Sequence, residues 1–154
     1  MTGRTCNIRL DFIAHWAWTI LYLLLALSGF SMMGSRFGWM FGYDFRAADF
    51  IHRVIGVVFI ILVLLVVIYE IVGTVRGRTA INSWLPIGKW GFAGFTFLTT
   101  LLIIFSGFLI WFHTSIPYIF GTFGFIVHEF VTLLSIGSIV GHIYDKSYVL
   151  RDIS

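Results

Sequence analysis

Four apolar runs dominate this sequence, at about residues 12–33, 50–73, 92–112 and 121–144. Each is close to the ~20 residues that an α-helix needs to cross a hydrocarbon core. A segment within lipid must satisfy its own backbone hydrogen bonds, so we expect every run to be a helix. Hydrophobic residues make up 59% of the chain and charged residues 11%, too little polar material to cover a water-soluble globule. The sequence predicts an all-α integral membrane protein, a four-transmembrane-helix bundle with residues 1–154 as one domain.

The lysines and arginines predict the orientation of the chain. Seven lie in the N-terminal tail, the loop after the second run and the C-terminal tail: Arg4, Arg9, Arg76, Arg78, Lys89, Lys146 and Arg151. Three lie on the other side: Arg36, Arg46 and Arg53. The positive-inside rule then places both termini in the cytoplasm. The first run is as long as a bilayer is thick, so we expect a retained span and not a signal peptide. The basic residues form no patch for nucleic acid.

The cysteine content limits the cofactors that the chain could hold. Cys6 is the one cysteine, and no Cys-x-x-Cys-His motif exists. A haem bound here would therefore lack the covalent attachment of c-type cytochromes. Iron–sulfur clusters held by cysteines are excluded within this chain.

Four of the five histidines fall within the apolar runs: His15, His52, His128 and His142. One histidine in an apolar helix is most often a hydrogen-bonded core residue, but four costly ionisable groups in a small bundle indicate a shared function. With both termini inside, His15 and His142 lie near the cytoplasmic side. His52 and His128 lie in the outer half, with a nominal difference of about 7 Å in depth. The histidines thus form two pairs at two depths.

The spacing within the last run favours two stacked haems. His128 and His142 are 14 residues apart, which is about 21 Å along a helix and about 40° short of four whole turns. Both therefore face one way. Two axial histidines close an iron to exogenous ligands, so such a centre transfers electrons. We predict two haems b, with iron ligands His15, His142, His52 and His128.

Small residues accompany the histidines. Gly29 is 14 residues from His15 and Gly107 reaches a similar depth, so both are predicted to make room for the outer macrocycle. On the face between His128 and His142, small or flat side chains would leave room for porphyrin: Thr132, Ser135 and Ile139. Gly137 and Gly141 form a GxxxG pair on the opposite face, which predicts close helix–helix contact.

Three further residues keep two interpretations each. His113, after the third run, is either an interfacial histidine or a contact of a haem propionate or a partner subunit. Arg53 would pair with a propionate or an acidic partner, or else reach to the interface as a lipid-facing arginine. Glu129 follows a predicted ligand, and it would orient that ligand or contact the partner.

The ordered set of motifs resembles the cytochrome b subunit of membrane-bound formate dehydrogenases and the related b-type cytochrome of nickel–iron hydrogenases. The matching segments lie between residues 11 and 144: His15-Trp16, Ala26-Leu27-Ser28-Gly29, Ile51-His52, Gly56, Gly88-Lys89-Trp90, Ser106-Gly107, Trp111, His128 and His142-Ile143-Tyr144. The resemblance implies that His52 and His128 bind the outer haem, and His15 and His142 the inner haem.

The resemblance also implies partners in a bacterial or archaeal cytoplasmic membrane. An iron–sulfur subunit would dock outside, joined to a molybdenum, tungsten or nickel–iron catalytic subunit, so no substrate-oxidising site is expected in this chain. Membrane quinone would be reduced beside the inner haem, near His142, Trp90 and Gly91. The family's quinone pocket uses an asparagine just after the Gly-Lys-aromatic segment, where this chain has Gly91-Phe92. Two possibilities stay open: the chain uses a different quinone, or it passes its electrons to another protein.

Two alternatives from other classes remain at this stage. A proton-relaying transporter subunit would use intramembrane histidines with carboxylates, and Glu70 and Glu129 are the carboxylates within the runs. A structural anchor for a soluble complex would leave the histidine geometry unexplained.

Overall fold

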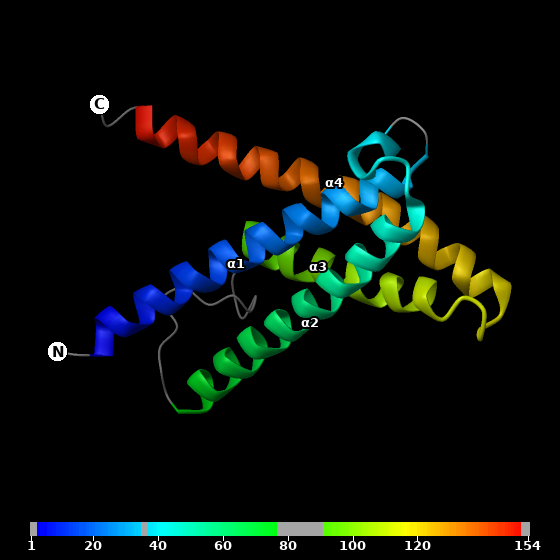
Figure 1. Cartoon of the computed structure of the whole chain (residues 1–154). Coiled ribbons are helices and arrows are strands. Elements are labelled where there is room, and N and C mark those ends of the chain that lie inside the picture. Colours follow the sequence, from blue (N-terminus) through cyan, green and yellow to red (C-terminus); the bar gives the residue numbers. More distant parts are fainter. Residues whose placement is uncertain (1–2, 35–36, 77–90, 152–154) are drawn as a thin grey trace. The chain divides into compact units, whose positions relative to one another are not determined.

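The computed structural model describes residues 3–34, 37–76 and 91–151, and the side chains within 12–34, 37–76 and 91–146 (Figure 1). Four long helices make up most of this part: α1 (Gly3–Met32), α2 (Phe45–Val75), α3 (Phe92–Trp111) and α4 (Tyr118–Arg151). Each contains a segment long and apolar enough to cross a membrane, and the described residues contain no strand. The predicted all-α fold with four apolar helices is confirmed.

Several helices run beyond the apolar segments that predicted them. α1 begins at Gly3 and α4 continues to Arg151, because hydropathy marks the hydrocarbon core and not the end of a helix. α2 begins at Phe45 because Asp44 caps it. The Asp44 Oδ1 atom accepts hydrogen bonds from the backbone N–H groups of Arg46 (3.0 Å) and Ala47 (3.1 Å).

Contacts divide the chain into two compact units, residues 1–79 and 80–154. The first is a hairpin of α1 and α2 joined through the short 3₁₀ helix η1 (Gly38–Phe41), and the second is a hairpin of α3 and α4 (Figure 1). Each hairpin is described by itself below. The single domain over residues 1–154 stays a prediction.

Small and hydroxyl side chains fill the contacts within the hairpins. The buried polar set includes Ser28 and Ser31 in α1 and Thr99, Thr100 and Ser106 in α3. Their hydroxyls donate mostly to carbonyls of their own helix, so they can be buried without losing a hydrogen bond. Ser28 and Ser106 are the most buried, at 1% and 0% exposed. Such residues let membrane helices approach closely, where large side chains would hold them apart.

Glycines near the start of α4, and not the predicted GxxxG pair, make the close contact with α3. An ideal Cβ on Gly124 would lie 2.8 Å from Leu109 Cβ and 3.2 Å from the Ser106 carbonyl oxygen. An ideal Cβ on Gly137 or Gly141 would meet nothing within 4 Å among the described residues. Within this hairpin the contact of α3 with α4 at glycine lies about four turns nearer the α4 N-terminus, and close contact of the GxxxG pair with another helix stays a prediction.

This difference yields a test on two glycines of the same helix. Gly124→Ala forces Leu109 and the α3 backbone to shift, and overpacking of this kind costs about 1–3 kcal/mol in the free energy of unfolding. Gly137→Ala adds a methyl group in open space, so it should be neutral or stabilise the helix by up to about 1 kcal/mol. Thermal unfolding of both purified variants in detergent is the measurement. Equal melting temperatures for the two variants would contradict the packing described here.

Candidate functional site

His52 is held at its Nδ1 atom by a serine of the neighbouring helix. The ring lies in α2, half-buried, with Nδ1 2.9 Å from Ser28 Oγ in α1. Ser28 Oγ also lies 2.9 Å from the Leu24 carbonyl oxygen and 3.1 Å from that of Leu25. A carbonyl can only accept, so when Ser28 donates its hydroxyl proton to its own helix, its oxygen is left to accept a proton from His52 Nδ1.

His128 is held in the same way in the second hairpin. Its Nδ1 lies 3.0 Å from Ser106 Oγ and 3.1 Å from the Ile103 carbonyl oxygen, both in α3. Ser106 donates its hydroxyl proton to the Leu102 carbonyl oxygen, at 2.7 Å. Because the Ile103 carbonyl is an acceptor only, His128 Nδ1 must carry the proton.

The glycine next to each serine lies beside the edge of the imidazole. An ideal Cβ on Gly29 would be 3.4 Å from His52 Cε1, and one on Gly107 would be 3.5 Å from His128 Cε1. The Nδ1–Cε1 edge of each ring therefore lies on a Ser-Gly pair. We name these the Ser28-Gly29/His52 module and the Ser106-Gly107/His128 module, one in each hairpin.

Both modules fit the chemistry of a haem ligand. With the proton on Nδ1, the lone pair of a neutral imidazole is on Nε2, the atom that can coordinate iron. A hydrogen bond from the other ring nitrogen is the usual support of a metal-bound histidine, because it sets both tautomer and ring orientation. Among the described residues, no three His, Cys, Asp or Glu side chains gather as a metal-binding cluster.

The other two predicted ligands have aromatic neighbours. His15 is exposed on α1, with its ring edge-on to Trp16 at 6.1 Å between centroids. His142 is half-buried in α4 and stacks on Phe92 of α3, with centroids 4.0 Å apart and an angle of 9° between rings. Each predicted haem would take one ligand from residues 1–79 and one from 80–154. Because these are the two separate units, the pairing of His52 with His128 and of His15 with His142 stays a prediction.

The predicted quinone site is described only in part. Trp90 lies outside the described residues, and Gly91 is exposed as the N-cap of α3. Phe92, at the place of the family's asparagine, is the residue that stacks on His142. Ser135, predicted beside the porphyrin, instead donates to Thr99 Oγ1 at 2.9 Å and is buried in the α3–α4 contact.

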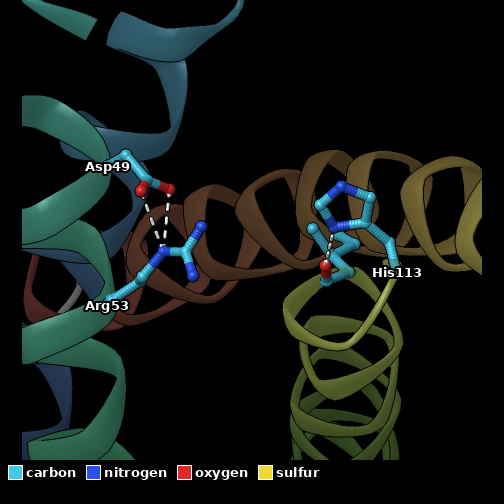
Figure 2. A network of polar contacts seen from close by, with 4 residues as sticks. Asp49, Arg53 and His113 are labelled. Atoms are coloured by element: carbon cyan, nitrogen blue, oxygen red, sulfur yellow. Dashed lines mark hydrogen bonds and ion pairs between the residues drawn. The ribbon is translucent and has the colours of Figure 1, made fainter. Parts of the chain in front are cut away.

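Arg53 and His113 both have partners within their own hairpin (Figure 2). Arg53 Nε lies 3.0 Å from Asp49 Oδ1 and 2.9 Å from Oδ2, one helical turn earlier in α2. Figure 2 shows the two terminal nitrogens of the guanidinium pointing away from Asp49. His113 is exposed and lies just after the end of α3. It donates through Nδ1 to the Ile110 carbonyl oxygen, at 2.7 Å.

The two carboxylates within the predicted apolar runs lie in different surroundings. Glu70 is 8% exposed in α2, and Glu129 is exposed in α4 next to His128.

The serines of the two modules were missed as functional residues by the sequence analysis. Ser28 and Ser106 entered it only within matching segments. The available signal was the dipeptide Ser-Gly near the end of two apolar runs, followed after 24 and 22 residues by a histidine in the next run. A repeat of this kind indicates equivalent roles for the two helix pairs.

The comparisons with known proteins identify the family. The family model described as prokaryotic cytochrome b561 matches residues 12–145, which is most of the chain and includes all four histidines of the apolar helices. No curated protein and no solved structure matches the chain. The chain therefore belongs to the prokaryotic cytochrome b561 family. It is a multi-pass membrane electron-transfer cytochrome with b-type haem, and this assignment favours electron transfer over the transporter and anchor alternatives.

Proposed function

Starting from this membership in the prokaryotic cytochrome b561 family, we propose that the chain carries electrons through two haems b. The electrons would pass from an outer iron–sulfur and catalytic subunit, that of a formate dehydrogenase, to membrane quinone. The observation that supports this most is the pair of Ser-Gly/His modules, in which the Nδ1 atom of each histidine lies 2.9 Å or 3.0 Å from a serine oxygen.

His52 and His128 are the proposed ligands of the outer haem. Each lies in the helix that follows a connection, η1 for α2 and residues 112–117 for α4. In a chain of four spans, the first and third connections lie on the same side of the membrane. Two histidines a few turns beyond those connections therefore belong to the same half of the bilayer. His15 and His142 are the proposed ligands of the inner haem.

A haem b held by two of these histidines would supply one-electron transfer, and with both imidazoles bound its iron would be closed to exogenous ligands. The chain's own residues hold and orient it. His52 and His128 are fixed by hydrogen bonds to α1 and α3, and the edges of their rings lie beside Gly29 and Gly107. Arg53 is aligned by Asp49, and its terminal nitrogens are proposed to contact a propionate or an acidic partner surface.

The donor enzyme and the quinone follow from the resemblance alone. A molybdenum or tungsten catalytic subunit would make the donor formate, and a nickel–iron subunit would make it hydrogen. Quinone is proposed to bind near His142, Trp90 and Gly91, on the cytoplasmic side. The stack of Phe92 on His142 would then form one wall of that site, in place of the family's asparagine.

The first test of this function is haem content. Purified protein should yield two haems b per chain by pyridine haemochrome, because four intramembrane histidines provide two axial pairs. His128→Ala should remove the outer haem and His142→Ala the inner haem. One haem per chain, or none, would contradict the proposal.

His113→Ala serves as the matched control for those variants. His113 lies outside the apolar helices and donates to the Ile110 carbonyl, so its loss should leave both haems bound. Haem loss from this variant would show that the ligand set was chosen wrongly.

Topology is tested by a reporter fused after Ser154. With seven Lys and Arg on the side of the termini against three on the other, the C-terminal fusion should be active only as a cytoplasmic reporter. A fusion after Tyr43, in the first connection, should be active only as an exported reporter. The opposite pattern would exchange the inner and outer haems throughout the proposal.

The direction of electron flow is tested with a quinone-analogue inhibitor during reduction by the native donor. The inhibitor should leave both haems reducible, perturb the spectrum of the inner haem and block quinol formation. Perturbation of the outer haem alone would place the quinone site on the wrong side. Haems that quinone never reoxidises would show that the electrons pass to another protein.

A further inference from the structure

We propose that Ser28 and Ser106 are positioning residues of the outer haem, and that they hold its reduction potential low by accepting hydrogen bonds from the Nδ1–H groups of His52 and His128. This inference rests on the proposed function, since it takes both histidines as ligands. It adds a role for two residues to which neither the resemblance nor the family match assigns one.

The geometry favours an electronic role over simple packing. Ser28 and Ser106 are the most deeply buried polar residues, at 1% and 0% exposed, so water cannot compete for their oxygens. Each serine donates its hydroxyl proton to a carbonyl oxygen of its own helix, that of Leu24 at 2.9 Å or that of Leu102 at 2.7 Å. This leaves each serine oxygen oriented as an acceptor toward a histidine. The Oγ–Nδ1 distance is 2.9 Å for Ser28 and His52 and 3.0 Å for Ser106 and His128.

An acceptor at Nδ1 changes what the imidazole gives to the iron. Drawing the Nδ1 proton toward oxygen raises the electron density and basicity of Nε2. A more basic axial ligand stabilises the oxidised iron relative to the reduced iron, which lowers the potential. Because the same bond occurs on both ligands, the two effects should add at one haem and be absent at the other.

The tests are Ser28→Ala, Ser106→Ala and the double variant. Alanine keeps the small volume and removes the serine oxygen. At His128 the Ile103 carbonyl oxygen, 3.1 Å from Nδ1, stays as a second acceptor, so Ser106→Ala should have the smaller effect of the two. Redox titration of the purified protein should show the outer haem shifted to higher potential. We expect the reduction equilibrium to change by up to about fivefold per variant, which is about 41 mV for a one-electron couple at 59 mV per tenfold. The inner haem should keep its potential, and the low-spin EPR signal of the outer haem should move.

Two neighbouring variants serve as controls. Ser31→Ala and Thr100→Val each remove a buried hydroxyl from the same two helices, where the hydroxyl bonds to its own helix at Ser28 O and Thr96 O. Neither should change the potential or the EPR signal of either haem. Ser28→Cys provides a small side chain with a weak acceptor, so the potential should lie between those of the wild type and the alanine variant.

The outcomes separate this inference from the proposed function. Loss of the outer haem alone from the alanine variants, with the inner haem still bound, supports the positioning role. Unchanged potential and EPR signal in every serine variant, or an equal shift in the controls, overturns it. If the alanine variants do not assemble, the Cys variant decides by the same criteria. A wild-type protein without haem would instead overturn the proposed function itself.

Discussion

The hydrogen bond from a histidine Nδ1 to a serine oxygen occurs once in each helical hairpin, and the rest of the site depends on it. It is formed between helices distant in sequence, so it requires the α1–α2 and α3–α4 contacts. It decides which imidazole nitrogen carries the proton, and therefore which nitrogen can coordinate iron. Gly29 and Gly107, next to the serines, lie beside the Cε1 edges of the two rings.

The bilayer explains why serine hydroxyls are the partners of the two histidine Nδ1 atoms. A buried polar group in hydrocarbon must be hydrogen-bonded, and a serine on a helix can satisfy itself with the carbonyl one turn earlier. In the part of the chain that the structure describes, no buried polar side-chain atom lacks a hydrogen-bond partner. A serine held in this way is small enough for close helix contact, and it still offers an oxygen to the neighbouring helix. The same residues therefore provide packing and orientation.

The amino-acid sequence predicted the helices well and their ends less well. Apolar length reports the hydrocarbon core, whereas the start of α2 depends on the Asp44 cap, which hydropathy does not register. Gly124, and not the GxxxG pair at Gly137 and Gly141, makes the close contact with α3, because spacing alone does not say where two helices cross. The histidines stood out as costly residues in lipid, whereas Ser28 and Ser106 are common in such helices, and their role needed three-dimensional distances. The pairing of histidines across the hairpins remains an inference from topology and resemblance.

The most direct test of the account is a cryo-electron microscopy map of the haem-loaded protein at a resolution that separates side chains. The account predicts one iron with the Nε2 atoms of His52 and His128 as its two axial ligands, and Ser28 and Ser106 at the two Nδ1 atoms. His52 and His128 bound to different irons, or either of them bound through Nδ1, would contradict it.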